Sequence, residues 1–337
     1  MTAGRRAAAS SAGGVYNGGR PVDPSREEDR PLTEVPTTTP PRRRPALLSL
    51  LVLALVAAVA AGCGGDDGAA GAEGDPAQTA PAATTIPLPD DVRATGTLVV
   101  ATDPTSPPNE FVAPDDGAIV GMDVDLAEAI GEKLGLDVVI ERVPFAAILP
   151  GVAARRYDLG ISSLTVTRAR ARTVDFVTYF RAGSAFYVRR GARAVRTLAD
   201  LCGRRVAVAR GTTQARDVRR QRGRCRRAGR PPVRLRLHRD QGGVDRALDA
   251  GRADVAVADA PVAAHAVARS RGALATSGRP YGIAPYGIAV APDRGLHEPV
   301  LAAVRALIAD GTYRSILREW GLERGAIDAP RLVSARG

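Results

Sequence analysis

Short apolar runs rich in β-branched residues alternate with segments of helical periodicity, and this alternation constrains the fold more than any other feature. Residues 97–102 (TLVVAT) are typical of a buried strand. Residues 123–134 predict a helix, because apolar residues recur every four positions on one face and Asp123 can cap the first turn. The other predicted elements are strands at 138–141, 159–162, 205–209, 233–237 and 254–258, and helices at 145–155, 213–222 and 244–250. Strands separated by helices of this length favour parallel α/β sheets, and two such runs predict two lobes with a ligand cleft between them.

The N-terminal segment, residues 1–63, has the composition of a leader followed by an export signal. Residues 1–45 are polar and lack an apolar period, which predicts disorder. An arginine cluster precedes the apolar run 46–61, whose length suits a signal peptide better than a membrane-spanning helix. The run ends in Ala-Ala-Gly-Cys63, which resembles a bacterial lipobox, where the cysteine is acylated and becomes the mature N-terminus. The alternative is an ordinary signal peptide followed by a chance cysteine, and both interpretations predict export.

Two segments that flank the alternating region are predicted to lie outside the core. Residues 64–95 begin GGDDGAAGAEGDPAQTAP, a composition that cannot bury enough apolar surface to offset the entropy of ordering. They are predicted to form a flexible tether. Residues 326–337 are predicted to be a C-terminal tail.

The net charge of +11 is carried almost entirely by arginine, since Lys133 is the only lysine. Such a charge can indicate a nucleic-acid or membrane-surface partner, but a solvated basic surface is the favoured interpretation. No aromatic residue interleaves with the arginines between Arg204 and Arg239, and the chain is predicted to be exported, so no nucleic-acid partner is predicted. The three histidines are scattered and no cysteine pair forms a C-x-x-C motif, so neither a metal nor another cofactor is predicted.

Eight stretches of the sequence, in order and between residues 96 and 323, carry a family resemblance. They read TDPTSPPNEF, GMDVDLAEAIGEKLG, YDLGISSLTVTRAR, VDFVTYF, GRRVAVARGTTQ, GRADVAVADAP, YGIAVAPD and ADGTYRSILREWG. Together they resemble the family 3 extracellular solute-binding proteins, the periplasmic amino-acid receptors of ABC importers. The resemblance implies a two-lobed periplasmic-binding-protein fold of type II, in which two extended strands form the hinge and the ligand cleft lies between the lobes.

The resemblance also implies where the chain crosses between the lobes. The first crossing is expected near residues 186–190 and the return near residues 286–290. Lobe 1 is then discontinuous and consists of residues 96–188 and 284–325, with two C-terminal helices at 297–310 and 312–320. Lobe 2 consists of residues 189–283.

An amino-acid receptor needs a fixed cation for the ligand carboxylate and a fixed anion for the ligand ammonium, because burying either group unpaired is costly. Arg170 occupies the arginine position of a T-x-T-x-x-R motif, which in the family grips the carboxylate through a planar, two-point guanidinium. The alternative for Arg170 is a surface salt bridge. Asp259 matches the family's acid for the ammonium, and its alternative role is a helix cap before Pro261.

Three more positions match residues that bind the ligand's main-chain groups in the family. Ser163 and Thr165 match side chains that form hydrogen bonds with the ligand. Thr213, in the stretch GTTQ, matches a position whose backbone N–H meets the carboxylate, at a helix start that turns its positive end toward the anion. By itself, a Gly-Thr-Thr turn is an ordinary loop.

The side-chain pocket is expected to include Asp103 and Phe145, although Phe145 could equally belong to the core. Ser106 stands where many members place an aromatic residue that stacks on the ligand, and Asn109 replaces a common phenylalanine. Fewer aromatic walls and more polar groups favour a ligand with a polar or charged side chain.

Cys202 and Cys225 flank the first strand and helix of the expected second lobe. In an oxidising compartment they are expected to form a disulfide, which contributes about 3 kcal/mol in the chain-entropy model. Two unpaired buried thiols are the alternative.

The resulting interpretation is a monomeric, lipid-anchored, extracytoplasmic receptor that captures a free amino acid by hinge closure for an ABC transporter permease. No chemistry is expected, so the chain is not predicted to be an enzyme. One alternative is a dehydratase acting on cyclic acids with the same fold, which needs a general acid or base in the cleft. Another is a stand-alone sensory ligand-binding module.

Overall fold

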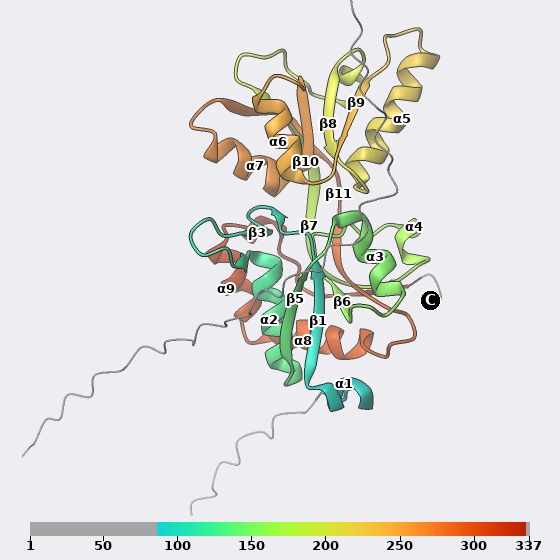
Figure 1. Ribbon diagram of the computed structural model, residues 1–337, viewed down its shortest axis with the longest axis vertical. Coiled ribbons are helices and arrows are strands. Elements are labelled where there is room, and N and C mark those ends of the chain that lie inside the picture. Colours follow the sequence, from blue (N-terminus) through green and yellow to red (C-terminus); the bar gives the residue numbers. More distant parts are fainter. Residues whose placement is uncertain (1–85, 335–337) are drawn as a thin grey trace, which may run out of the picture. The chain divides into compact units, whose positions relative to one another are not determined.

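The computed structural model describes residues 86–334, which form two α/β lobes (Figure 1). The predicted leader, signal peptide and lipidated cysteine (residues 1–63), and most of the predicted tether, lie outside this range. Within the described range, no helix combines the length and apolar character needed to cross a membrane.

Lobe 1 is built around three parallel strands, with β1 hydrogen-bonded to β5 on one side and to β6 on the other. The apolar face of α2 packs on this sheet through Leu126 and Ile130, which are fully buried. Two C-terminal helices, α8 and α9, contact α2 and complete the core. The elements of lobe 1 are β1 (Thr97–Thr102), α2 (Met122–Leu134), β5 (Asp137–Arg142), α3 (Phe145–Ala153), β6 (Leu159–Gly160), α4 (Arg168–Ala171), α8 (His297–Ala309), α9 (Thr312–Glu319) and η2 (Glu323–Gly325). A small antiparallel sheet joins β2 (Thr105–Ser106), β3 (Glu110–Val112) and β4 (Ile119–Val120).

Lobe 2 repeats the pattern, with β8 lying between its parallel neighbours β9 and β10. Its elements are η1 (Leu198–Leu201), β8 (Arg205–Ala209), α5 (Thr213–Arg227), β9 (Arg234–His238), α6 (Gln241–Asp249), β10 (Val255–Asp259) and α7 (Ala260–Arg269). The predicted disulfide between Cys202 and Cys225 is present and fastens the segment before β8 to the last turn of α5.

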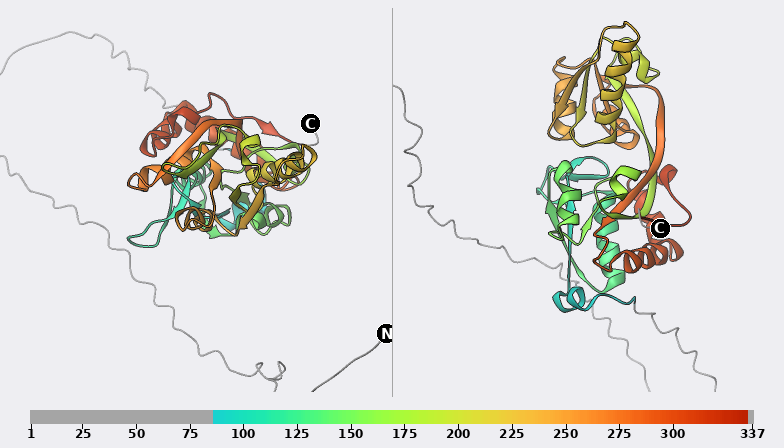
Figure 2. Two further views of the ribbon diagram at one scale, coloured as in Figure 1. Left: turned by 90° about the horizontal axis from the view of Figure 1, so that it is seen from above. Right: turned by 90° about the vertical axis from the view of Figure 1, so that its right-hand side faces the viewer.

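Two long antiparallel strands, β7 (Asp175–Arg189) and β11 (Leu274–Val290), run through both lobes. They join the strands into one sheet of order β5-β1-β6-β11-β7-β10-β8-β9. The right-hand view of Figure 2 shows β11, in orange, beside β7 along this path. The predicted two-strand connection is therefore confirmed.

The first crossing predicted near residues 186–190 is wrong by several residues. Ser184 to Tyr187 already pair with β10, so β7 enters lobe 2 between Phe180 and Ser184. The return on β11 lies between Tyr281 and Tyr286, where the register shifts repeatedly. Strand β7 is mostly apolar and buried on both sides of the crossing, and only Arg181 and Ala182 interrupt that burial. The apolar pattern alone therefore gives little sign of where the lobe changes.

Both predicted flanking segments contain regular structure. Helix α1 (Asp90–Thr95) occupies the end of the predicted tether, because Val92 is buried in the lobe 1 core and Asp91 forms an ion pair with Arg294. Strand β12 (Leu332–Val333), within the predicted tail, pairs with β7.

Candidate functional site

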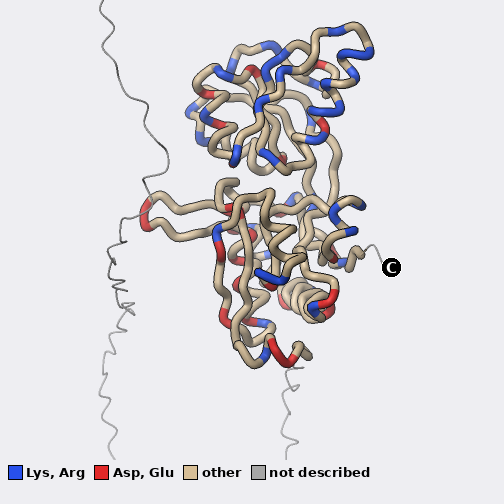
Figure 3. Tube along the Cα trace, turned by 45° about the vertical axis from the view of Figure 1, so that its right-hand side comes forward, with Lys and Arg blue, Asp and Glu red and all other residues tan. Residues whose placement is uncertain are grey.

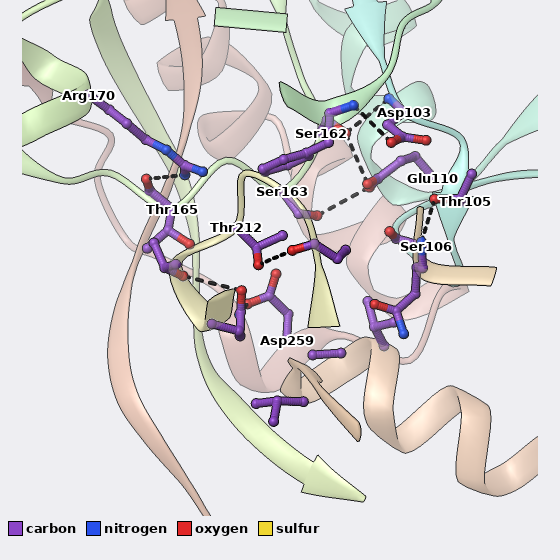
Figure 4. A pocket seen from close by; sticks show the side chains of 18 residues that line it. Asp103, Thr105, Ser106, Glu110, Ser162, Ser163, Thr165, Arg170, Thr212 and Asp259 are labelled. Atoms are coloured by element: carbon purple, nitrogen blue, oxygen red, sulfur yellow. Dashed lines mark hydrogen bonds between the residues drawn. The ribbon is translucent and has the colours of Figure 1, made fainter. Parts of the chain in front are cut away.

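A pocket lies where the carboxyl ends of strands from both lobes face each other (Figure 4). The cavity that it encloses measures about 40 Å³. The structure brings all seven residues expected at the ligand site to this pocket. They are Asp103, Phe145, Ser163, Thr165, Arg170, Thr213 and Asp259.

Arg170 projects from α4 into the pocket and is only 8% exposed. Its Nη1 donates to the Thr165 carbonyl at 2.8 Å, and its Nη2 donates to the Gly211 carbonyl of lobe 2 at 3.2 Å. The guanidinium carbon lies 5.4 Å from the centre of the Phe145 ring, within cation–π range. Burial lowers the pKa of Arg170 to about 10, so the group is charged at neutral pH. These surroundings do not fit the alternative of a surface salt bridge.

Phe145 fills both of the roles considered for it. It lines the pocket beneath Arg170, and it also packs against the core cluster that contains Ile148. Its backbone N–H donates to Asp103 Oδ2 at 2.9 Å, which fixes one oxygen of that carboxylate. Burial raises the pKa of Asp103, whose side chain lines the pocket just beyond the end of β1.

Asp259 is the last residue of β10 and stands at the N-cap position of α7. Its side chain makes no capping hydrogen bond, so the alternative role as a helix cap is not realised. Instead it accepts a hydrogen bond from Gln214 Nε2 at 2.7 Å and lines the pocket. Burial raises the pKa of Asp259 to about 6.

Thr213 is the first residue of α5, a position whose backbone N–H has no partner within the helix. The cap is the preceding residue, Thr212, whose hydroxyl accepts from the backbone N–H of Ala215 at 3.1 Å. Gly211 has a φ of +83°, and a Cβ there would lie 3.1 Å from the side chain of Ala146 in lobe 1. This glycine therefore allows a close approach of the helix start to lobe 1.

Ser163 lies in the left-handed region at φ +50°, which is costly for a residue with a side chain and is typical of functional sites. Its backbone N–H donates to Asp123 Oδ2 at 2.6 Å, and its hydroxyl lies 3.2 Å from Glu110 Oε2. Asn109 donates to the same hydroxyl at 2.7 Å. Asn109 is thus fully buried behind the pocket wall, whereas Ser106 lines the pocket itself.

Two buried carboxyl groups, Glu110 and Asp123, share a hydrogen bond behind Ser163. Burial and the neighbouring charge of Asp123 raise the pKa of Glu110 well above its usual range, so Glu110 holds the shared proton. Tyr179 donates to Asp123 Oδ1 at 2.7 Å. The predicted capping role of Asp123 is therefore wrong, because its carboxylate is used in this buried cluster and Gly121 occupies the N-cap position.

Glu110 lines the pocket although no motif predicted it there, and the same holds for Ser162, Gln214 and Gln241. Gln214 spans from Ser184 to Asp259 through its amide nitrogen, at 2.9 and 2.7 Å. The available signal for Glu110 was an acidic residue inside a short strand, in the stretch PPNEF. The role of Glu110 in the pocket depends on its hydrogen bond with Asp123, which lies on another element.

Replacing Glu110 by glutamine should flatten the dependence of stability on pH. A carboxyl whose pKa is raised by folding stabilises the native state fully only below its unfolded pKa, and this contribution is lost as pH rises through the native pKa. We expect the melting temperature of the wild type to fall more than that of Glu110→Gln between pH 5 and pH 8. Glu132→Gln, at an exposed position of α2, is the matched control and should behave like the wild type. Parallel curves for all three proteins would contradict a protonated Glu110.

Residues 98–323 match the family model described as bacterial extracellular solute-binding proteins, family 3. The arginine-binding protein ArgT of Corynebacterium glutamicum is 33% identical over 242 residues, which cover 72% of this chain and 79% of that protein. The solved structure of an ancestral arginine-binding protein bound to arginine is 34% identical, with a TM-score of 0.62 over 67% of this chain and 98% of that one. An ancestral amino acid-binding protein, a precursor of cyclohexadienyl dehydratase, is 26% identical, with a TM-score of 0.62 over 68% of this chain and 98% of that one.

Proposed function

The chain belongs to the bacterial extracellular solute-binding proteins of family 3, and from this premise we propose that it captures a free amino acid with a cationic side chain, such as arginine, for an ABC importer. The observation that carries the choice of ligand is the charge of the pocket wall. Among the described residues, Arg170 is the only basic side chain that lines the pocket, whereas three acidic side chains line it, of which Glu110 is kept neutral beside Asp123. They are Asp103, Glu110 and Asp259.

Each charged group of the ligand has a counterpart in this wall. The ligand carboxylate binds the guanidinium of Arg170 and the backbone N–H groups at the start of α5, near Thr213. The ammonium binds the carboxylate of Asp259. Ser163 and Thr165 form hydrogen bonds with the same main-chain groups. Because Glu110 holds a proton, Asp103 is the remaining anion, and a cationic side chain supplies its partner.

Capture proceeds by closure of the lobes about β7 and β11, without any covalent step. Lobe 1 supplies Arg170, and lobe 2 supplies Asp259, so a ligand that contacts both favours the closed arrangement. In the described structure, Arg170 Nη2 already bonds to the Gly211 carbonyl of lobe 2. The ligand carboxylate takes over this guanidinium, and the importer's permease recognises the closed form.

An enzymatic role as a dehydratase has less support. ArgT and the ancestral arginine-binding protein are named as binding proteins, and the solved precursor of cyclohexadienyl dehydratase is itself described as an amino acid-binding protein. Among the described residues, no histidine lines the pocket, so imidazole is not available there as a general base. Incubation with a cyclic amino acid such as arogenate should leave the substrate unchanged.

The remaining assignments concern how the receptor is held at its site of action. Family members act outside the cytoplasm. We expect a monomer that is acylated at Cys63 and tethered to the outer face of the membrane. With the corrected crossings between the lobes, lobe 1 consists of residues 96–180 and 286–325. Metabolic labelling with a fatty acid tests the anchor. Label should be incorporated into the wild type and not into Cys63→Ser, and equal labelling of both would contradict the lipobox.

A thermal-shift screen against the twenty amino acids tests the proposed ligand. A ligand at one hundred times its Kd stabilises the native state by about 2.7 kcal/mol, which is readily measured. We expect arginine to give the largest shift, followed by other cationic amino acids. A dominant shift with an acidic or apolar amino acid would contradict the proposal.

Asp103→Asn should reduce the selectivity for a cationic side chain. The variant keeps an oxygen that can accept the Phe145 N–H bond but removes the negative charge. We expect arginine affinity to fall by about 10- to 100-fold, the usual range for losing a hydrogen bond between charged groups, while glutamine affinity changes little. Calorimetric titration with arginine and with glutamine gives the ratio of the two affinities in each protein. Equal losses for arginine and glutamine would show that Asp103 does not recognise the side-chain charge.

A further inference from the structure

The charges of the chain are divided unequally between the lobes. Lobe 2, residues 181–285, contains 24 arginines and 7 aspartates, a net charge of +17. Lobe 1, residues 96–180 and 286–325, contains 12 basic and 17 acidic residues, a net charge of −5. A genome that favours arginine codons would affect both parts alike. The basic charge of lobe 2 therefore needs another cause.

Figure 3 shows the basic residues gathered over lobe 2, while acidic and basic residues are mixed over lobe 1. Few of these arginines are neutralised by a neighbour. In the part of lobe 2 that the structure describes, ion pairs within 4.0 Å join only three arginines to aspartates. They are Arg205 with Asp254, Arg220 with Asp217, and Arg246 with Asp240.

A groove on the outer side of lobe 2 concentrates this charge. We call it the α5–β9 groove, and it is lined by Arg219, Arg222, Arg226, Leu235 and Leu237. The arginines lie three and four residues apart on one face of α5, and all three are exposed. The leucines are half-buried on the adjacent strand β9. None of these residues lines the ligand pocket.

We propose that the α5–β9 groove docks lobe 2 on a bilayer of anionic phospholipids. Guanidinium groups bind phosphate in a two-point geometry, and a row of three spaced along one helix face can engage several headgroups. The two leucines offer apolar surface at the depth where headgroups meet acyl chains. A receptor that passes its ligand to a membrane permease works beside such a surface.

A nucleic acid would match the charge but not the composition of the groove. Single-stranded nucleic acids are bound by aromatic side chains on which the bases stack, and the segment from α5 to β9, residues 213–238, contains no phenylalanine, tyrosine or tryptophan. Family members also act outside the cytoplasm. The charge and the apolar floor together therefore favour a lipid surface.

The test measures partition of the full-length chain onto sedimented vesicles at about 0.1 M salt. One set of vesicles contains phosphatidylcholine alone, and the other contains equal parts of phosphatidylcholine and phosphatidylglycerol. The ratio of the two partition coefficients isolates the electrostatic contribution, because the apolar run at residues 46–61 contributes to both. Each arginine at an anionic surface contributes about a fivefold factor, so Arg219→Gln, Arg222→Gln and Arg226→Gln together should lower the ratio by about 100-fold.

The matched control removes the same charge from exposed positions of lobe 1, by Arg142→Gln, Arg305→Gln and Arg318→Gln. We expect this control to lower the ratio by less than about fivefold, because these side chains lie outside the groove. Both triple variants should keep the thermal shift produced by their amino-acid ligand, which shows that they are folded. Raising the salt to about 0.5 M should abolish the preference of the wild type for anionic vesicles.

Three results would overturn the proposal. The first is a wild-type ratio near one. The second is an equal loss in the two triple variants, which would mean that only net charge matters. The third is displacement of the wild type from anionic vesicles by double-stranded DNA at equal phosphate concentration, which would assign the groove to nucleic acid.

Discussion

Arg170→Ala is expected to lower the affinity for the amino-acid ligand by about two to four orders of magnitude. Removing one partner of a buried charge pair costs about 3–5 kcal/mol, because the other charge stays buried without a counterion. Arg170 is only 8% exposed and its guanidinium bonds to two main-chain carbonyls, and no other basic side chain among the described residues lines the pocket to take its place. Isothermal titration calorimetry with arginine measures the loss.

The fold should survive this substitution, since Arg170 bonds only to carbonyl groups that border the pocket and can accept water instead. Arg168→Ala is the matched control, because Arg168 lies two residues away on α4 and is exposed. We expect its affinity to stay within about twofold of the wild type, as is usual for surface substitutions. Normal binding by Arg170→Ala would exclude the carboxylate site.

Asp259→Asn should also lower affinity by about two orders of magnitude or more, since the ligand ammonium would lose its counterion. The wild type should in addition bind more weakly at low pH. The pKa of Asp259 is raised to about 6, so at pH 5 only about one site in eleven carries the charge, against about ten in eleven at pH 7. Apparent affinity for arginine should therefore fall about tenfold between pH 7 and pH 5.

The ligand is not the source of this pH dependence, because its ammonium and guanidinium stay protonated throughout that range. Calorimetric titrations at pH 5, 6, 7 and 8 should show that the affinity for arginine depends on pH in the wild type and in Asp103→Asn, but not in Asp259→Asn. A pH dependence that persists in Asp259→Asn would assign the titrating group to another residue.

The alternation of strands and helices could be predicted from the sequence because both patterns are local. Strand β8 has the predicted bounds, Arg205–Ala209. Helix α5 extends five residues beyond its predicted end at residue 222, to Arg227. Those last residues are mostly arginine and lack an apolar period, whereas Cys225 buries the final turn and is joined to Cys202. Tertiary contacts therefore lengthened this helix.

The pocket could be predicted where a motif places a residue at the carboxyl end of a buried strand, as for Asp103 and Asp259. Glu110 and Gln214 could not be predicted in this way. Their roles come from partners on other elements, Asp123 for Glu110 and Asp259 for Gln214. Asp123 was predicted to be a helix cap because its position in the sequence fits a cap. Its true partner, Tyr179, lies on another element and approaches it only in the folded chain.

Because β7 and β11 are paired, lobe 2 is a continuous segment inserted into lobe 1, and we call this segment the cassette. Ala182 and Ala284 are register partners, so the two ends of the cassette are separated by one strand spacing, about 4.8 Å. A corresponding segment from a relative can replace the cassette at these two positions without changing the path of lobe 1. Evolution or engineering can therefore exchange the half of the site that carries Asp259 and the α5–β9 groove in one step, while Arg170 and Asp103 stay in place.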